Sequence, residues 1–313
     1  MFKTSYLNSE KLPLVIEPAE NRIKSLSFTE TVINQREFFN RELTKHGALL
    51  FRRLGAKTAD EFESFVRRFG GVDLLDYAGG VSPRTSLNRG VYTSTEYPPN
   101  LSLSLHNELS YSESYPSRLY FFCLVEPESG GETTIGDSRR ILKNIDSSIV
   151  NAFKSKKVRY DRNLSGEKGS GYSWQDAFET EDRQAVEDYC RKIGAQYEWK
   201  ADGGLRLSQI RPATAFHPVT NEEVWFNQAD GFHPSNLDAE TYELMRGNYR
   251  LNACFGDGEP FDVAMLEHIR QVLRRETVPV KWQFGDILIV DNILSAHGRM
   301  PFSGARKIVL AMT

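Results

Sequence analysis

Hydrophobic and polar residues alternate in a short segment that also carries two candidate metal ligands. In LSLSLHNELS, residues 101–110, leucine fills most odd positions, while serine, histidine and glutamate fill the even ones. Successive side chains of a β-strand point to opposite faces, so this period of two predicts a strand with one apolar and one polar face. His106 and Glu108 would lie side by side on the polar face. There they either face solvent or hold a ligand together.

Helical patterns come first along the chain, and strand patterns follow. Apolar residues recur at helical spacing over residues 27–46, and again after a capping box formed by Thr58 and Glu61. From about residue 74, short strand patterns alternate with Gly- and Pro-rich turns. Between the two helical patterns, GALLFRRL at residues 47–54 is predicted to form a strand. The first part of the chain is therefore predicted to be mainly helical and the rest mainly β.

This order of elements predicts a mainly β, α+β fold. Two further helical patterns, near residues 180–193 and 261–275, interrupt the strands, and the chain ends on strand patterns. Strands at both ends of a long stretch, with helices ahead of it and inserted in it, are typical of a β-sandwich or barrel with helical decoration. No linker stands out. We therefore expect one domain over residues 1–313, with a helical lead-in over about 1–73 and a β core with a helical insertion over about 74–313.

Composition narrows the classes of partner. The 313 residues carry a formal net charge of −3 and are 40% hydrophobic, which gives no reason to expect nucleic acid or an anionic membrane as a partner. No apolar run approaches the roughly 18 residues that a membrane helix needs, and the N-terminus lacks the apolar core of a signal peptide. Cys123, Cys190 and Cys254 are too widely spaced for a CxxC metal site or a disulfide framework. We expect a cytoplasmic protein, and the oligomeric state stays open.

A histidine and an arginine near the C-terminus extend the candidate site. His297 follows an apolar strand pattern, residues 287–290, in a predicted loop, and Arg306 opens the last strand. On that strand Arg306 would share a face with apolar side chains. A guanidinium in such surroundings needs an anion, because burying an unpaired charge is costly, and its planar fork suits a carboxylate.

Together these residues predict a metal site that also binds a keto acid. Two histidines and one carboxylate, here His106, Glu108 and His297, form the facial triad of Fe(II) enzymes and leave three coordination positions open. The same ligands also suit a hydrolytic zinc site. Arg306 favours iron, because a keto acid that chelates the metal needs a cation for its far carboxylate. The charges of Fe(II), Glu108, a dianionic keto acid and Arg306 then sum to zero.

Several spaced motifs resemble those of one known family. The segments HNELSYSESYPSRLYFFCLVEPESGGETTIGDSR, EVWFNQADGFH and DNILSAHGRMPFSGARKIVL resemble the TauD/TfdA family of Fe(II)- and 2-oxoglutarate-dependent dioxygenases. Within it they are most similar to the Glu-containing branch that includes clavaminate synthase and the SyrP-type hydroxylases. The resemblance covers about residues 75–313. It implies a double-stranded β-helix, or jelly roll, with His106, Glu108 and His297 as iron ligands and Arg306 with Thr133 as 2-oxoglutarate-binding residues.

The resemblance also implies a reaction. We expect an enzyme that uses Fe(II), 2-oxoglutarate and O2 to hydroxylate a C–H bond of an amino acid, free or tethered to a carrier protein, in secondary metabolite biosynthesis. Succinate and CO2 would be the coproducts. Arg84, Arg211 and Asn227 are candidate substrate-binding residues.

Other reactions and classes of protein stay open. Desaturation, epoxidation or cyclisation could use the same chemistry. Another class is a zinc-dependent hydrolase or isomerase on a cupin-like barrel, and a third is a barrel without catalytic activity. Halogenation is disfavoured because related halogenases have a small residue where this chain has Glu108. A JmjC-type protein hydroxylase is disfavoured because that group usually anchors the keto acid with a lysine elsewhere in the barrel.

Overall fold

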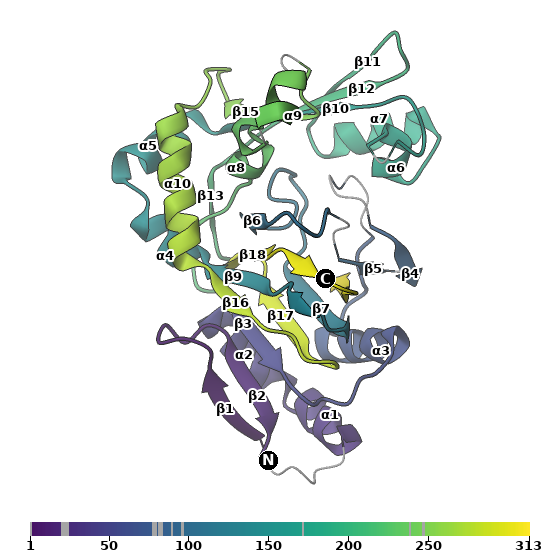
Figure 1. The fold of residues 1–313 in the computed structure, drawn as a ribbon, viewed down its shortest axis with the longest axis vertical. Helices are drawn as coiled ribbons and strands as arrows, with labels where there is room; N and C mark the ends of the chain where they lie inside the picture. The colour runs from purple at the N-terminus through teal and green to yellow at the C-terminus, as the bar shows by residue number, and fades with distance from the viewer. Residues whose placement is uncertain are drawn as a thin grey trace.

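The computed structural model describes residues 2–19, 25–76, 80, 84–88, 90–94, 97–170, 172–237, 239–245 and 248–313. Within these ranges the strands form one sheet of eight strands, two of four and two of two (Figure 1).

The eight-stranded sheet joins the two ends of the chain. In order across the sheet, its strands are β1 (Phe2–Tyr6), β2 (Leu14–Pro18), β3 (Ala48–Phe51), β17 (Ile287–Asp291), β7 (Arg118–Val125), β20 (Lys307–Met312), β5 (Val91–Thr93) and β4 (Ser86–Asn88). The neighbours are antiparallel except β2 and β3, which run parallel. The lead-in therefore adds three strands to this sheet. The strand expected over residues 47–54 is confirmed as β3, whereas β1 and β2 were not expected.

A four-stranded sheet packs against one face of the eight-stranded sheet. Its order is β16 (Val278–Val280), β9 (Thr133–Asp137), β18 (Ser295–Arg299) and β6 (Leu103–His106). Alternate residues of the large sheet enter different cores: Phe121 packs between the two sheets, while Phe122 packs on the opposite face. Leu310 and Val309 divide in the same way. This period of two is consistent with the two-layered jelly roll that the family resemblance implied.

Three helices cover the outer face of the large sheet, in the lower part of Figure 1. They are α1 (Ser25–Asn34), α2 (Arg36–His46) and α3 (Ala59–Gly70). The helix expected over residues 27–46 is broken at Gln35. Thr58 caps α3 as predicted, because its side chain accepts a hydrogen bond from the backbone N–H of Glu61 at 3.2 Å. The aromatic face of α3 is buried, and the rings of Phe62 and Phe122 stack with centroids 5.2 Å apart.

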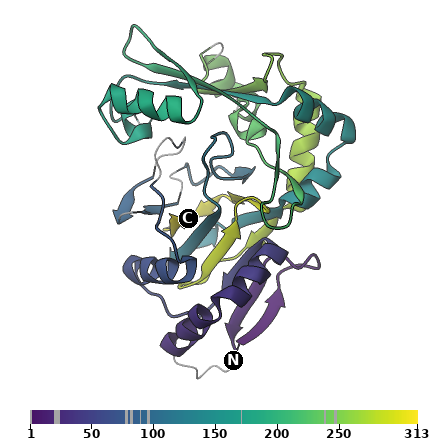
Figure 2. The same ribbon diagram turned by 180° about the vertical axis from the view of Figure 1, so that it is seen from behind.

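The remaining elements form an upper lobe and one flank, seen from both sides in Figures 1 and 2. A sheet of β11 (Gln196–Trp199), β12 (Leu205–Arg211), β10 (Val158–Leu164) and β15 (Leu251–Phe255) lies in the lobe with α6 (Trp174–Phe178) and α7 (Arg183–Lys192). The other helices are α4 (Ser138–Asn144), α5 (Ser147–Lys156), α8 (Ala229–Phe232), the short 3-10 helix η1 (Pro234–Asn236), α9 (Ala239–Leu244) and α10 (Val263–Glu276). Two strand pairs complete the fold, β13 (Thr214–Phe216) with β14 (Glu223–Trp225) and β8 (Ser129–Gly130) with β19 (Phe302–Ser303). The predicted inserted helices correspond to α7 and α10.

No helix in the described ranges combines the length and apolarity needed to cross a membrane.

Two expectations about the site strands were wrong. β6 ends at His106, so Glu108 lies in the turn that follows rather than on the strand. The backbone N–H and C=O of Glu108 bond to the side chain of Asn292, at 2.7 and 3.0 Å, and so do not join a sheet ladder. His297 lies on strand β18, not in a loop. A one-dimensional pattern could not reveal that the short SAHGR segment pairs on both sides with other strands.

Candidate active site

The two histidines meet because their strands are neighbours. His297 on β18 and His106 on β6 are register partners, and their ring centroids are 4.3 Å apart. Directly opposite residues of an antiparallel pair project from the same face, which brings two distant parts of the chain together. Gly298 permits this close approach, since a Cβ there would lie 2.4 Å from the carbonyl oxygen of Leu103.

Glu108 completes the group from the turn after β6. Its Oε2 atom lies 3.7 Å from His297 Nε2. One ligand atom from each of His106, Glu108 and His297 can be chosen so that all three lie within 4.8 Å of one another. Among the residues that the structure describes, this is the one group of three or more His, Cys, Asp or Glu side chains arranged for a metal ion. The three predicted ligands therefore lie together.

The imidazole nitrogens suit metal binding. His106 Nδ1 donates to the carbonyl oxygen of Ser104 at 2.9 Å, which leaves Nε2 as the nitrogen that could bind a metal ion. Nδ1 of His297 is buried without a hydrogen-bond partner. Burial is the main reason that the pKa of His297 lies well below its usual value, and charge repulsion from His106 and Arg84 lowers this pKa further. A neutral imidazole is the form that binds metals, so this donor set fits Fe(II).

Two asparagines that the sequence interpretation did not include fix the backbone around Glu108. Asn292 is fully buried, and besides Glu108 its side chain donates to the carbonyl oxygen of Pro116 at 2.8 Å. Asn107 donates to the carbonyl oxygen of Asn292 at 2.7 Å. The signal in the sequence was the polar pair DN directly after the apolar strand ILIV. Buried polar side chains there need partners. Asn292 finds them on the backbone of Glu108, while Asp291 accepts from the backbone N–H groups of Ile293 and Leu294.

Arg84 lies at this group rather than on the surface. Its Nη2 donates to Glu108 Oε2 at 2.7 Å, and the two side chains are 3% and 4% exposed. Its proposed contact with a substrate stays a prediction, while its contact with the metal-ligand group is a feature that the sequence did not suggest.

Arg306 and Thr133 also lie together, as expected. Arg306 Nη2 lies 3.5 Å from Thr133 Oγ1, and its Nε donates to the carbonyl oxygen of Gly131 at 2.9 Å. Gly131 has a φ of +70°, and a Cβ there would lie 3.1 Å from Arg306 Cδ. A glycine in the GGET motif is therefore needed both for the turn and for the close packing of the arginine.

The pocket beside the histidines is lined by Arg299 as well as by Arg84 and Arg306. His106, His297 and Thr133 line it too. Arg299 is buried, and its donors contact the carbonyl oxygens of Tyr97, Pro98 and Leu101 at 2.6–2.9 Å. Burial, together with the charge of Arg299, lowers the pKa of Arg306 to about 10, so the guanidinium remains a cation at neutral pH.

The other two substrate candidates bond to their own surroundings. Arg211 donates to the carbonyl oxygens of Ile193 and Ile210. Asn227 donates to the carbonyl oxygen of Ala213 at 2.8 Å and accepts from the N–H of Ala229 at 3.1 Å. Neither residue lines the pocket beside the histidines. Their roles in substrate binding stay predictions.

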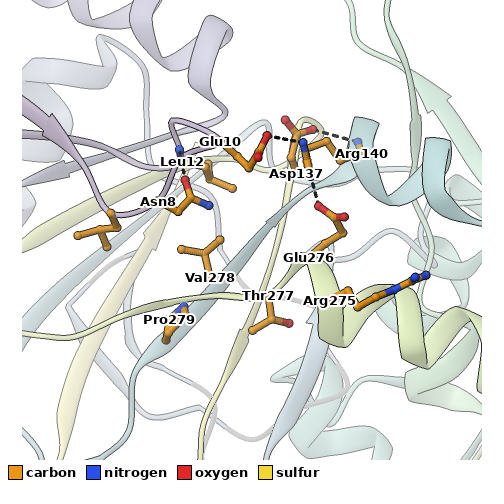
Figure 3. Close-up of a pocket in the computed structure, with 11 residues that line it drawn as sticks. Asn8, Glu10, Leu12, Asp137, Arg140, Arg275, Glu276, Thr277, Val278 and Pro279 are labelled. Carbon is orange, nitrogen blue, oxygen red and sulfur yellow. Dashed lines mark hydrogen bonds and ion pairs between the residues drawn. The ribbon is translucent and has the colours of Figure 1, made fainter.

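A second pocket lies at the opposite end of β9. Its lining includes Glu10, Asp137, Arg140 and Glu276. Figure 3 shows Arg140 between two carboxylates, with Nη1 2.5 Å from Glu10 and Nε 2.8 Å from Glu276. Arg140 therefore has carboxylate partners within the protein.

Comparison with known proteins identifies the family. Residues 10–313 match the sequence model of the family described as "Taurine catabolism dioxygenase TauD, TfdA family". The chain belongs to this family. It is therefore a non-haem Fe(II)- and 2-oxoglutarate-dependent dioxygenase, which consumes O2, and the zinc-dependent alternative is disfavoured.

Two relatives are similar over most of the dioxygenase. The dapdiamide synthesis protein DdaC of Enterobacter agglomerans is 37% identical over 286 residues, covering 88% of this chain and 86% of the relative. A clavaminate synthase-like protein of Arabidopsis thaliana is 33% identical over 322 residues, covering 98% of this chain and 95% of the relative.

A solved structure shares the fold. PvcB from Pseudomonas aeruginosa matches with a TM-score of 0.56 at 16% identity, covering 99% of this chain and 90% of PvcB. A second solved structure of PvcB is described as that of an Fe, alpha-ketoglutarate dependent oxygenase from an isonitrile synthetic pathway. At this identity the likeness supports the fold alone.

Proposed function

We propose that this dioxygenase hydroxylates a C–H bond of an amino acid, either free or tethered to a carrier protein, in natural-product biosynthesis. Succinate and CO2 are the coproducts. The observation that carries the proposal is the convergence of His106, Glu108 and His297 beside a pocket that Arg306 lines. The similarity to DdaC, a protein of dapdiamide synthesis, supports the amino-acid class of substrate. The cytoplasm stays the expected compartment.

We assign the metal-ligand roles to His106 Nε2, His297 Nε2 and the carboxylate of Glu108. Two neutral imidazoles and one carboxylate on one side of a metal leave positions for further ligands. Fe(II) held by this set supplies the O2 activation that couples decarboxylation of 2-oxoglutarate to substrate oxidation. The bond from His106 Nδ1 to Ser104 fixes the ring orientation and the tautomer.

Arg306 and Thr133 are assigned to the far carboxylate of 2-oxoglutarate. Arg306 Nε is already held by Gly131, so its two terminal nitrogens are the groups that can face a carboxylate. A charge-assisted pair with a guanidinium is stronger than a neutral hydrogen bond. Thr133 Oγ1 accepts a hydrogen bond from Trp282 Nε1 at 3.1 Å, so its own O–H remains to donate to a bound carboxylate.

Apolar side chains limit the access of water to this site. Phe121 is 4% exposed, and its ring centroid lies 5.3 Å from that of His297. Leu310, from β20, lines the same pocket and is 1% exposed. Exclusion of water strengthens each charged contact in the pocket and protects reactive intermediates from side reactions.

The test is a turnover assay of the full chain. The protein is purified without metal and reconstituted with Fe(II) and 2-oxoglutarate. It is then offered amino acids, both free and as thioesters on a carrier protein, while O2 uptake and succinate are measured. We expect one amino-acid class to stimulate succinate formation and to gain one oxygen atom. Loss of two hydrogens instead would identify desaturation or ring closure by the same site.

The control is the same protein loaded with Zn(II). It should neither consume O2 nor form succinate. Hydrolysis or isomerisation by the zinc-loaded protein, with no 2-oxoglutarate-dependent O2 uptake by the iron-loaded protein, would contradict the proposal.

A further inference from the structure

We propose that Arg84 is a positioning residue that fixes the orientation of the Glu108 carboxylate toward the histidines, so that the carboxylate meets the metal through a single oxygen. This inference rests on the ligand set proposed above. It gives Arg84 the role of orienting the metal ligand Glu108, in place of direct contact with the substrate.

The contact is buried and specific. Arg84 Nη2 lies 2.7 Å from Glu108 Oε2, with both side chains almost fully removed from solvent. In the described part of the chain, no other side chain donates a hydrogen bond to this carboxylate. The same Oε2 atom is the one 3.7 Å from His297 Nε2. Arg84 therefore acts on the oxygen nearest the histidine pair.

Both partners are fixed by the fold. The residue after Arg84, Thr85, exchanges hydrogen bonds with Thr93 on β5, with the backbone N–H of each as donor and both distances 2.8 Å. On the other side, Asn292 holds both backbone groups of Glu108. The arginine thus reaches Glu108 from the edge of the large sheet, while the glutamate is anchored to the end of β17. Neither partner depends on a long, freely rotating surface side chain for its position.

This geometry has a consequence for coordination. A carboxylate can bind a metal through one oxygen or through both. A guanidinium hydrogen bond to Oε2 occupies one of its lone pairs and fixes the plane of the carboxylate, which favours ligation through one oxygen over ligation through both. Single-oxygen ligation leaves the three open positions that a keto acid and O2 require.

The direction in which metal affinity changes when Arg84 is replaced shows whether Arg84 orients Glu108 or acts only through its positive charge. A cation near a metal site repels the metal, so removing a guanidinium that acted by charge alone would tighten metal binding. Removing a group that orients a ligand weakens metal binding, typically 10- to 100-fold. The two roles therefore predict opposite changes in affinity.

The experiment is an anaerobic titration with Co(II), a redox-stable probe, in the absence of 2-oxoglutarate and substrate. Wild type, Arg84→Gln and Arg84→Lys are compared by dissociation constant and by visible d–d absorption, which reports coordination number. We expect Arg84→Gln to bind Co(II) roughly 10- to 100-fold more weakly and with an altered spectrum. Arg84→Lys should fall between the two, because it keeps the charge but loses the planar fork. Arg140→Gln is the matched control, since it removes an arginine–carboxylate contact at the distant pocket, and it should match wild type.

Each outcome decides between the claims. If wild type does not bind Co(II), the proposed function fails. If wild type binds and Arg84→Gln binds equally well or more tightly with an unchanged spectrum, Arg84 does not position Glu108. Unchanged Co(II) binding with a raised KM for substrate would likewise overturn the inference in favour of substrate binding. If Arg84→Gln does not fold, as judged by circular dichroism, Arg84→Lys decides, and affinity equal to wild type overturns the inference.

Discussion

At the Asp137 end of β9 Arg140 pairs with two carboxylates, whereas at the Thr133 end Arg299 and Arg306 have no carboxylate partner among the described residues. In the first pocket, Arg140 contacts both Glu10 and Glu276 (Figure 3). In the second, Arg299 and Arg306 donate to backbone carbonyl groups and hydroxyls. Over the described ranges, no carboxylate lies within ion-pair distance of either arginine.

This difference separates a structural site from a ligand site. Charges that neutralise one another within the protein contribute modestly to stability and need no further partner. Positive charge that only neutral oxygens solvate is costly when buried, and an anion that enters the pocket relieves that cost. The fold thus keeps uncompensated positive charge next to the histidines, where 2-oxoglutarate, a dianion, is expected to bind. Experiments on the two pockets should therefore give contrasting results.

The largest expected effect is the loss of the metal ligands. His106→Ala and Glu108→Ala should each abolish 2-oxoglutarate-dependent succinate formation, because two remaining ligands do not hold Fe(II) in the required geometry. Glu10→Gln, in the pocket of Figure 3, is the matched control and should retain full activity. Succinate formation at the wild-type rate in either alanine variant would reject the ligand assignment.

Arg306→Gln should raise the KM for 2-oxoglutarate. A lost buried charged contact is worth roughly 2–5 kcal/mol, or roughly 30- to 5,000-fold in affinity. Steady-state kinetics with 2-oxoglutarate as the varied substrate measures the change. A KM within twofold of wild type would mean that another group holds the cosubstrate. It would contradict the view that the arginines without carboxylate partners mark the anion-binding pocket.

The buried pair of Asp286 and Arg52 lies outside both pockets. It tests whether burial keeps a carboxyl protonated even when an arginine is near. Asp286 is 1% exposed and lies 3.6 Å from Arg52 Nε. Burial raises the pKa of its carboxyl from 3.8 to about 7, and its Oδ1 has no hydrogen-bond partner. Because the folded state holds the proton more tightly than the unfolded state, this carboxyl contributes its full stability below about pH 4. The contribution is lost as the pH rises to about 7.

The measurement is the free energy of unfolding of wild type and Asp286→Asn from pH 4 to pH 8. The variant should gain stability relative to wild type over this range, by up to about 4 kcal/mol. A difference that does not vary with pH would show that Asp286 is ionised throughout, like the paired carboxylates of Figure 3.

Asn292→Ala should destabilise the protein and weaken the metal site together. It removes the partner of the Glu108 N–H, and an unsatisfied buried group costs about 1–3 kcal/mol. Asn144→Ala is the control, because Asn144 donates to Glu276 at an exposed position, and it should cost less than about 1 kcal/mol. Denaturant unfolding and Co(II) titration of both variants give the comparison. Equal effects of the two substitutions would argue against a special role for Asn292.

The smallest effect is expected for Arg140→Gln. Exposed ion pairs contribute about 0–1 kcal/mol, so the free energy of unfolding should fall by no more than that. The KM for 2-oxoglutarate should stay the same. A changed KM would couple the two ends of β9 and contradict the distinction between the pockets.

The sequence determined the local elements and indicated which residues are candidates for the site. The apolar stripe and capping box of α3 follow from neighbours three and four residues apart, and the strand ILIV follows from its continuous apolar run. The residues expected to bind metal and 2-oxoglutarate, such as Glu108 and Arg306, were recognisable because few other side-chain types suit those ligands. These features depend on short-range spacing or on side-chain chemistry, and both are visible in one dimension.

Only the tertiary structure decided which partners these residues meet. The pairing of His106 with His297 depends on β6 lying beside β18, and the contact of Arg84 with Glu108 depends on the edge of the large sheet reaching the turn after β6. β1 and β2 gave no clear strand pattern in the sequence, because β2 is paired and buried through contacts with β3, which lies about 30 residues further along the chain. Energies of burial and hydrogen bonding depend on neighbours in space. For that reason the sequence supplied the chemistry, and the fold decided which arginine has a carboxylate partner and which is left to bind an anion.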